Sequence, residues 1–370
     1  MTTAERRLVP ALFDGGRLRQ ARTFRGLRKA ELAAAIGVTP AAVGQYESER
    51  TRPSVHVLAS LALSLSFPPE FFERRTVVRR IEESEAHFRK LRSTSKAERD
   101  RLLVRLEFLT ELVEDLERHV ELPVVNIPDL PVMDDADEVA PEAAAAEARR
   151  VWGLGPGPLD HVVRLLEAKG VIVVRPHVNN QGVDAFSTAA TGRPIVVLGS
   201  DKADAARSRF DAAHELGHLV MHQDADPGRH LIERQAHRFA GAFLMPAETI
   251  RAEFPTRMSW PAFFRLKQRW RVSLQSLLYR ARTLGTLSPD AYQRAQIYLS
   301  TQGWREHEPI DIGAPEQPTL LRRALELVQQ DLQITKGSMA SIARLPEDVV
   351  ESLLADVGVH DGERPRVVVG

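Results

Sequence analysis

The pentapeptide HELGH at residues 214–218 constrains this chain more than any other segment. The surrounding sequence predicts a helix, and side chains four positions apart lie above one another on one face of a helix. Two imidazoles placed in this way can bind one zinc ion, with the intervening Glu215 turned toward the water that the metal activates. Because Leu219 and Val220 indicate a buried helix, the two histidines need partners there. The alternative is a pair of structural histidines with this spacing by chance.

The absence of cysteine narrows the kind of metal site. It excludes disulfides, a cysteine nucleophile, iron–sulfur clusters and thiolate zinc sites. A catalytic zinc ion needs a third protein ligand and an open position. Glu233, 15 residues beyond His218, lies on the first turn of the next predicted helix. The packing face of that helix consists of Ala236, Phe239, Ala240 and Phe243.

These two helices resemble the ImmA/IrrE family of zinc metallopeptidases. Residues 213–218 read AHELGH and residues 233–246 read ERQAHRFAGAFLMP. The family pattern is an AHELGH-type helix followed by a Glu-x-x-Ala-(Asn/Asp)-x-Phe-Ala helix that ends in Leu-Met-Pro. The resemblance extends from about Trp152 to Trp304. It implies that His214, His218 and Glu233 bind zinc and that Glu215 is the catalytic carboxylate.

Two further histidines accompany this set. His237 stands where the family usually has Asn or Asp, so it is expected either to orient a ligating histidine through one ring nitrogen or to reach the metal itself. His222 follows His218 by one helical turn. It either supports the site or packs as a structural residue.

The reaction that the resemblance implies is peptide-bond hydrolysis. Zinc lowers the pKa of the attacking water and polarises the scissile carbonyl, while Glu215 takes the proton and later returns it to the leaving amine. The predicted strand at 194–198 comes just before the metal helix. It is expected to present an exposed edge, to which an extended substrate adds as a further strand.

A second motif lies near the N-terminus, where residues 16–53 read GRLRQARTFRGLRKAELAAAIGVTPAAVGQYESERTRP. Gly37 suits the left-handed position that ends one short helix, and Thr39 and Pro40 suit the N-cap and first position of the next. This is the helix-turn-helix arrangement, whose second helix lies in the DNA major groove. The whole stretch resembles the Xre/phage-repressor family.

The resemblance also implies which residues contact double-stranded DNA. Lys29, Thr39, Arg50 and Arg52 stand at phosphate-contacting positions, and Gln45 stands at a base-reading position. Pro40 and Ala41 replace polar base readers that the family often has. They can make only apolar contacts, for example to a thymine methyl group.

The charge distribution agrees with a DNA-binding N-terminal part. The net charge is zero, but residues 1–100 carry 19 basic and 12 acidic side chains, whereas the remainder carries 31 and 38. The basic excess suits phosphate contacts. No apolar run approaches the ~18–20 residues that span a bilayer, and no secretory signal is visible. We therefore expect a cytoplasmic protein without a membrane partner.

The chain is predicted to be mainly α with a small β-sheet, the α+β class. The expected domains are an all-α helix-turn-helix domain at 1–75, a helical connector at 76–121, an acidic Pro-rich linker at 122–141, a zincin-like peptidase domain at 142–304 and a helical C-terminal subdomain at 305–370. Strands are expected at 171–174, 183–188 and 194–198. Apolar residues at spacings of three and four between 102 and 120 predict a helix that either packs on its own protein or forms a homodimer.

Together these features predict a DNA-binding transcriptional regulator with a zinc-dependent endopeptidase domain. The resemblance implies a protein substrate that is a repressor or an antitoxin-like partner. One alternative is a transcription factor whose metal domain senses or binds a partner with little turnover. Another is an antitoxin-type protein that neutralises a partner by binding alone.

Overall fold

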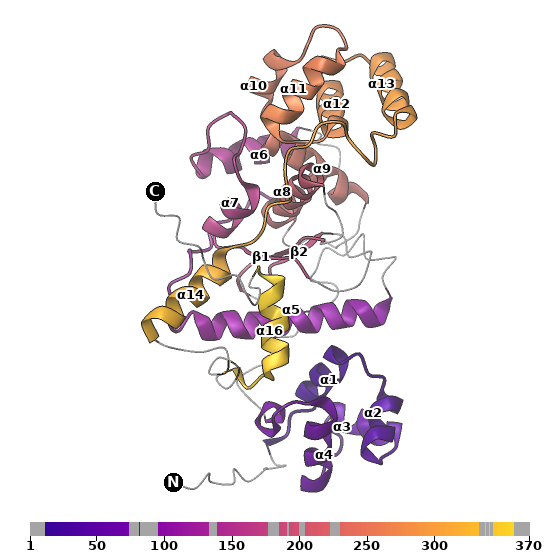
Figure 1. Cartoon of the computed structure of the whole chain (residues 1–370), viewed down its shortest axis with the longest axis vertical. Coiled ribbons are helices and arrows are strands. Elements are labelled where there is room, and N and C mark those ends of the chain that lie inside the picture. Colours follow the sequence, from indigo (N-terminus) through magenta and orange to yellow (C-terminus); the bar gives the residue numbers. More distant parts are fainter. Residues whose placement is uncertain are drawn as a thin grey trace. The chain divides into compact units, whose positions relative to one another are not determined.

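The computed structural model describes residues 12–73, 81, 95–132, 139–176, 185–190, 192–199, 204–222, 230–332, 337, 340 and 343–358 (Figure 1). The chain folds into two compact units. Unit 1 comprises Met1–Glu83, Arg92–Leu122 and Leu321–Gly370, and unit 2 comprises Ser84–Leu91 and Pro123–Leu320. The fold is α+β, as predicted. Of the helices in these described stretches, none has the length and apolar character that crossing a membrane requires.

The N-terminal part of unit 1 is a cluster of short helices. These are α1 (Gly15–Phe24), α2 (Lys29–Ile36), α3 (Pro40–Glu47), α4 (Val55–Leu65) and the 3-10 turn η2 (Pro69–Phe72). The predicted turn between α2 and α3 is confirmed. Gly37 ends α2 with φ 70°, and the Thr39 hydroxyl accepts a hydrogen bond from Ala42 N at 3.2 Å, where α3 begins with Pro40.

The longest helix, α5 (Lys96–Leu116), packs against α1 within the same unit. Its predicted apolar stripe is buried, and so are residues on its flanks, such as Phe108. The Phe108 ring lies 5.5 Å from that of Phe24 and 5.7 Å from that of Phe71. The stripe residues within α5 are thus buried in the single chain, which favours the first of the two alternatives. The homodimer stays a prediction.

The C-terminal helices also belong to unit 1. They are α14 (Leu320–Leu332) and α16 (Glu347–Asp356), and α16 lies beside α5. Arg25 of α1 pairs with Asp348 at 2.5 Å, and Arg105 of α5 pairs with Asp356 at 2.5 Å. Residues 305–370, expected as one subdomain, are thus divided between the two units.

Unit 2 contains a three-stranded sheet of β1 (Ile172–Val174), β2 (Phe186–Thr188) and β3 (Ile195–Val197) in the order β1-β3-β2. β3 pairs in parallel with β1 and antiparallel with β2. The exposed edge predicted at 194–198 is therefore wrong, because β3 is the central strand. The physical reason is that strand order depends on pairing between distant segments, which the position of a strand along the chain does not reveal.

The other elements described in unit 2 are helices. They are α6 (Ala140–Val151), α7 (Val162–Ala168), α8 (Ala205–Met221), α9 (His230–Leu244), α10 (Ala247–Glu253), α11 (Trp260–Trp270), α12 (Leu274–Thr283) and α13 (Pro289–Thr301). Of these helices, α7 and α8 contact the sheet. The neighbouring pair α8 and α9 occupies the centre of one hydrophobic core, with α6 beside both (Figure 1). α8 begins at Asp204, whose carboxylate accepts hydrogen bonds from two backbone N–H groups of the first turn.

Part of the predicted linker is packed rather than free. Asn126 N donates to Lys169 O at 3.0 Å, Leu130 N donates to Val220 O at 2.9 Å, and the Arg193 side chain donates to Pro123 O at 2.7 Å. Residues 123–132 therefore follow the surface of unit 2. The most acidic part of the linker, 133–138, lies outside the described residues.

Candidate metal centre and DNA-binding surface

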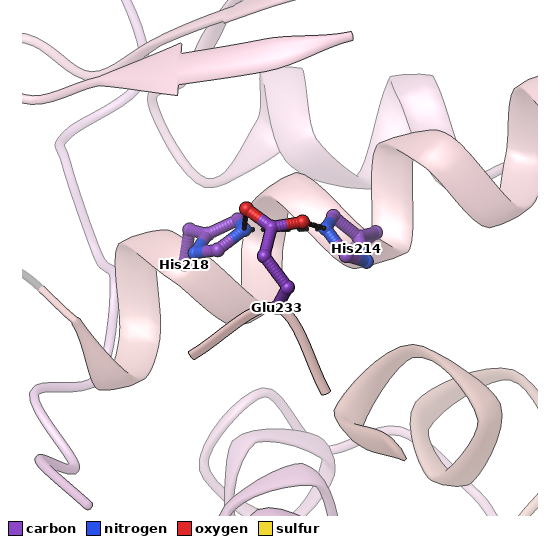
Figure 2. A group of neighbouring side chains, drawn as sticks. All are labelled: His214, His218 and Glu233. Carbon is purple, nitrogen blue, oxygen red and sulfur yellow. Dashed lines mark hydrogen bonds and ion pairs between the residues drawn. The ribbon is translucent and has the colours of Figure 1, made fainter. Parts of the chain in front are cut away.

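Three predicted ligands come together in unit 2. Figure 2 shows His214 and His218 projecting from α8 with the carboxylate of Glu233, from the first turn of α9, between the two rings. The two Nε2 atoms are 3.2 Å apart, Glu233 Oε2 is 3.5 Å from His214 Nε2, and Glu233 Oε1 is 3.7 Å from His218 Nε2. In the part of the chain that the structure describes, these side chains form a group able to hold a metal ion.

The geometry of this group fits zinc. Tetrahedral coordination with bonds of 2.0–2.2 Å places neighbouring ligand atoms roughly 3.3–3.6 Å apart. Each histidine nitrogen lies close to a different oxygen of Glu233, and one ligand atom from each of the three residues lies within 4.8 Å of the other two. The three side chains are therefore close enough together to bind one ion. Two imidazoles and one carboxylate are also a ligand set of catalytic zinc. The His218 side chain is 1% exposed and that of His214 is 12% exposed, so the site opens toward solvent on the His214 side.

Close packing of α8 on α9 brings Glu233 within reach of the histidines. Gly217 lies at the contact, where a Cβ atom would stand 3.0 Å from Phe239 Cδ1 and 3.3 Å from Ala236 Cα. A larger residue at position 217 would force the helices apart. The sequence interpretation assigned Gly217 no role, although a small residue in a buried helix facing Ala236 is a signal for such an approach.

Glu215 lies buried on the same helix as the two histidines, and β2 holds it. The hydroxyl of Ser187 donates to Glu215 Oε2 at 2.9 Å, and Ser187 itself is fully buried. The edge strand β2 therefore contacts the group expected to move protons. Sequence reasoning missed Ser187, because a lone serine in a short strand carries no local signal.

His222 lies next to the cluster and contacts His218; whether it supports the site or packs as a structural residue stays a prediction. Its Nδ1 lies 3.1 Å from Nδ1 of His218, and its Nε2 lies 2.9 Å from Oε1 of Gln235. Burial lowers the pKa of His222. Gln235, two residues after Glu233, was not singled out from the sequence.

His237 lies one turn beyond Glu233 on α9 and next to aromatic rings. Its ring centroid is 4.7 Å from that of Phe210 and 5.1 Å from that of Tyr279. These rings hold the imidazole in a small pocket that Ser276 and Thr283 also line. The described group of potential metal ligands consists of His214, His218 and Glu233, without His237.

In unit 1, the residues predicted to contact DNA lie on or near α2 and α3. Thr39, Gln45, Arg50 and Arg52 are exposed, and Lys29 begins α2 nearby. Glu47 connects α3 to both α1 and α2. Its carboxylate pairs with Arg22 of α1 at 2.5 Å and with Lys29 of α2 at 3.2 Å.

These two sites define the classes of the two parts of the chain. A HExxH helix with a carboxylate from the next helix is typical of a metallopeptidase-like domain, and α2–turn–α3 is typical of a helix-turn-helix DNA-binding domain. Residues 166–282 match the peptidase family described as the IrrE N-terminal-like domain, and residues 18–72 match the helix-turn-helix family. The chain therefore fuses an Xre-type helix-turn-helix domain to an ImmA/IrrE-like domain. No curated protein matches it.

Proposed function

We propose that this protein is a DNA-binding transcriptional regulator whose second domain is a zinc-dependent endopeptidase that cleaves one regulatory protein, a repressor or an antitoxin-like partner. The observation that carries the proposal is the convergence of His214, His218 and Glu233, whose ligand atoms lie within 4.8 Å of one another. Two imidazoles and one carboxylate are a ligand set of catalytic zinc. In this proposal the DNA-binding domain spans 1–75 and the peptidase domain 142–304. Glu215 is the catalytic residue.

The surroundings of Glu215 support this role. Zinc, when bound, supplies a Lewis acid that activates water and polarises a carbonyl group. The Glu215 carboxylate accepts the proton of the attacking water and gives it to the leaving amine. The hydroxyl of Ser187 donates a hydrogen bond to Oε2 of that carboxylate and so orients it.

An extended segment of the substrate is proposed to bind along β2. Among the described strands, β2 lies at one end of the order β1-β3-β2 and pairs with β3. Addition of a strand at a sheet edge aligns a peptide without reading many side chains. Because Ser187 belongs to β2, the same strand would position both the peptide and the base.

The test compares the wild-type protein with Glu215→Gln, both loaded with zinc. Each is added to a protein extract of the source cells, and new N-termini are labelled and identified by mass spectrometry. We expect new N-termini in one protein with the wild type, none with Glu215→Gln, and one zinc ion per chain in both. Identical N-termini with the variant, or none with the wild type, would contradict the peptidase proposal.

A further inference from the structure

A buried hydrogen-bond chain leads away from the metal centre. It runs from His218 Nδ1 to His222 Nδ1 over 3.1 Å, and from His222 Nε2 to Gln235 Oε1 over 2.9 Å. The three residues are 1%, 2% and 5% exposed, so water does not compete for these contacts. His222 belongs to the end of α8 and Gln235 to α9.

The positions of the ring protons of His218 and His222 follow from the groups at the two ends of this hydrogen-bond chain, the metal centre and Gln235. Nε2 of His218 faces His214 and Glu233, and a ligating nitrogen carries no proton. The proton of a neutral His218 is therefore on Nδ1, which donates to Nδ1 of His222. The remaining proton of His222 is then on Nε2, which donates to the carbonyl oxygen of Gln235.

We propose that His222 and Gln235 are positioning residues that hold His218 as its Nδ1–H tautomer and so set the metal affinity of the site. This inference rests on the proposed metal centre. Hydrogen bonds from beyond the ligands fix the tautomer and ring orientation of a ligating histidine, and their loss typically costs about 10–100-fold in metal affinity.

The side-chain carbonyl of Gln235 determines which atoms donate and which accept in the hydrogen bonds from His218 to His222 and from His222 to Gln235. This carbonyl accepts a hydrogen bond from Nε2–H of His222, and an amide is not a base that removes this proton. An apolar residue of similar size would remove the acceptor and leave a buried N–H without a partner. A carboxylate would keep the acceptor at the same place and make His218 a stronger donor to the metal.

The first experiment reads the tautomers directly. The ring nitrogens of the full-length, metal-free protein are labelled with ¹⁵N, and their chemical shifts are assigned with His218→Gln and His222→Gln. We expect Nδ1–H at His218 and Nε2–H at His222. A proton on Nε2 of His218, or on Nδ1 of His222, would overturn the proposal.

The second experiment measures zinc affinity by competition with a chromophoric chelator. Gln235→Leu is expected to weaken zinc binding about 10–100-fold, whereas Gln235→Glu is expected to match or exceed the wild type. Gln275→Leu, at an exposed position of α12, is the matched control and should leave the affinity unchanged. A residue that merely fills space would give the opposite order, because a buried carboxylate is harder to accommodate than leucine.

The two proposals fail in different ways. A wild-type protein that binds no zinc contradicts the metal centre, whatever the tautomers. A wild-type protein that binds zinc, with equal affinity in Gln235→Leu, contradicts the role of Gln235 and leaves the metal centre intact.

Discussion

The close contact of α8 and α9 at Gly217 predicts that alanine there lowers the stability of the protein. The same substitution at Gly241 is predicted to raise it. In Gly217→Ala the new Cβ would stand 3.0 Å from the ring of Phe239 and 3.3 Å from the backbone of Ala236. Phe239 is fully buried and stacked on Phe243 at 5.7 Å, so the ring has little room to move. Overpacking of this kind costs about 1–3 kcal/mol.

Helix propensity offsets part of this cost. Alanine is more favourable than glycine in a helix interior by about 1 kcal/mol. The expected net loss is therefore up to about 2 kcal/mol in the free energy of unfolding, or up to roughly 8 °C in melting temperature for a unit of this size. Zinc affinity should fall too, since separation of the helices moves Glu233 away from His214 and His218.

Gly241→Ala provides the matched control. Gly241 lies in the interior of α9, and a Cβ there would meet nothing within 4 Å. This variant should be more stable than the wild type by about 0.5–1 kcal/mol and bind zinc equally well. Both are measured by urea denaturation of the full chain and by chelator competition. If Gly217→Ala were as stable as Gly241→Ala, close helix packing could not be what brings Glu233 to the site.

Three further predictions concern unit 1. Gly15→Ala should destabilise the unit by about 3 kcal/mol or more and abolish DNA binding, because its Cβ would overlap the carbonyl oxygen of Tyr46. Circular dichroism measures the loss of stability, and fluorescence anisotropy with duplex DNA measures the loss of binding. Arg52→Ala should weaken duplex binding similarly for all sequences and reduce the slope of log K against log salt by about 0.9, the value for one phosphate contact. Burial raises the pKa of Glu107 above its ordinary 4.5, so the folded state binds this proton more tightly than the unfolded state. The resulting stabilisation is present below pH 4.5 and lost as the pH rises through the folded pKa. Glu107→Gln should remove that decline in melts recorded from acid to neutral pH, and an unchanged decline would contradict the assignment.

The parts of the metal site that were predictable from the sequence are those set by local geometry. The spacing of His214 and His218 places both rings on one helical face whatever surrounds the helix. Glu233 was identified from the family pattern rather than from geometry, because the sequence around it does not indicate which helix it faces. The turn between α2 and α3 was predictable for the same reason as the histidine pair: Gly37 and Thr39 act on adjacent backbone groups.

The groups that support these residues were not predictable, because each depends on a contact between distant segments. Ser187 precedes Glu215 by 28 residues, and its role follows from the position of β2 at the sheet edge. The order of the strands in the sheet was likewise not predictable from the sequence. The local sequence of three short strands does not specify their order in a sheet. Chain order therefore suggested an exposed edge at 194–198, whereas pairing makes β3 central.

The same limit applies, more strongly, to the architecture of unit 1. The apolar pattern of 347–356 shows that one face of a helix is buried, and it does not show what that face covers. The answer comes from pairs such as Arg25–Asp348, which are 323 residues apart in the chain. Since residues on both sides of unit 2 in the sequence build unit 1, the chain of the peptidase-like unit is inserted into the DNA-binding unit rather than appended to it. A fragment ending at residue 75 would therefore lack α5 and α16, whose residues pack on Phe24 and pair with Arg25.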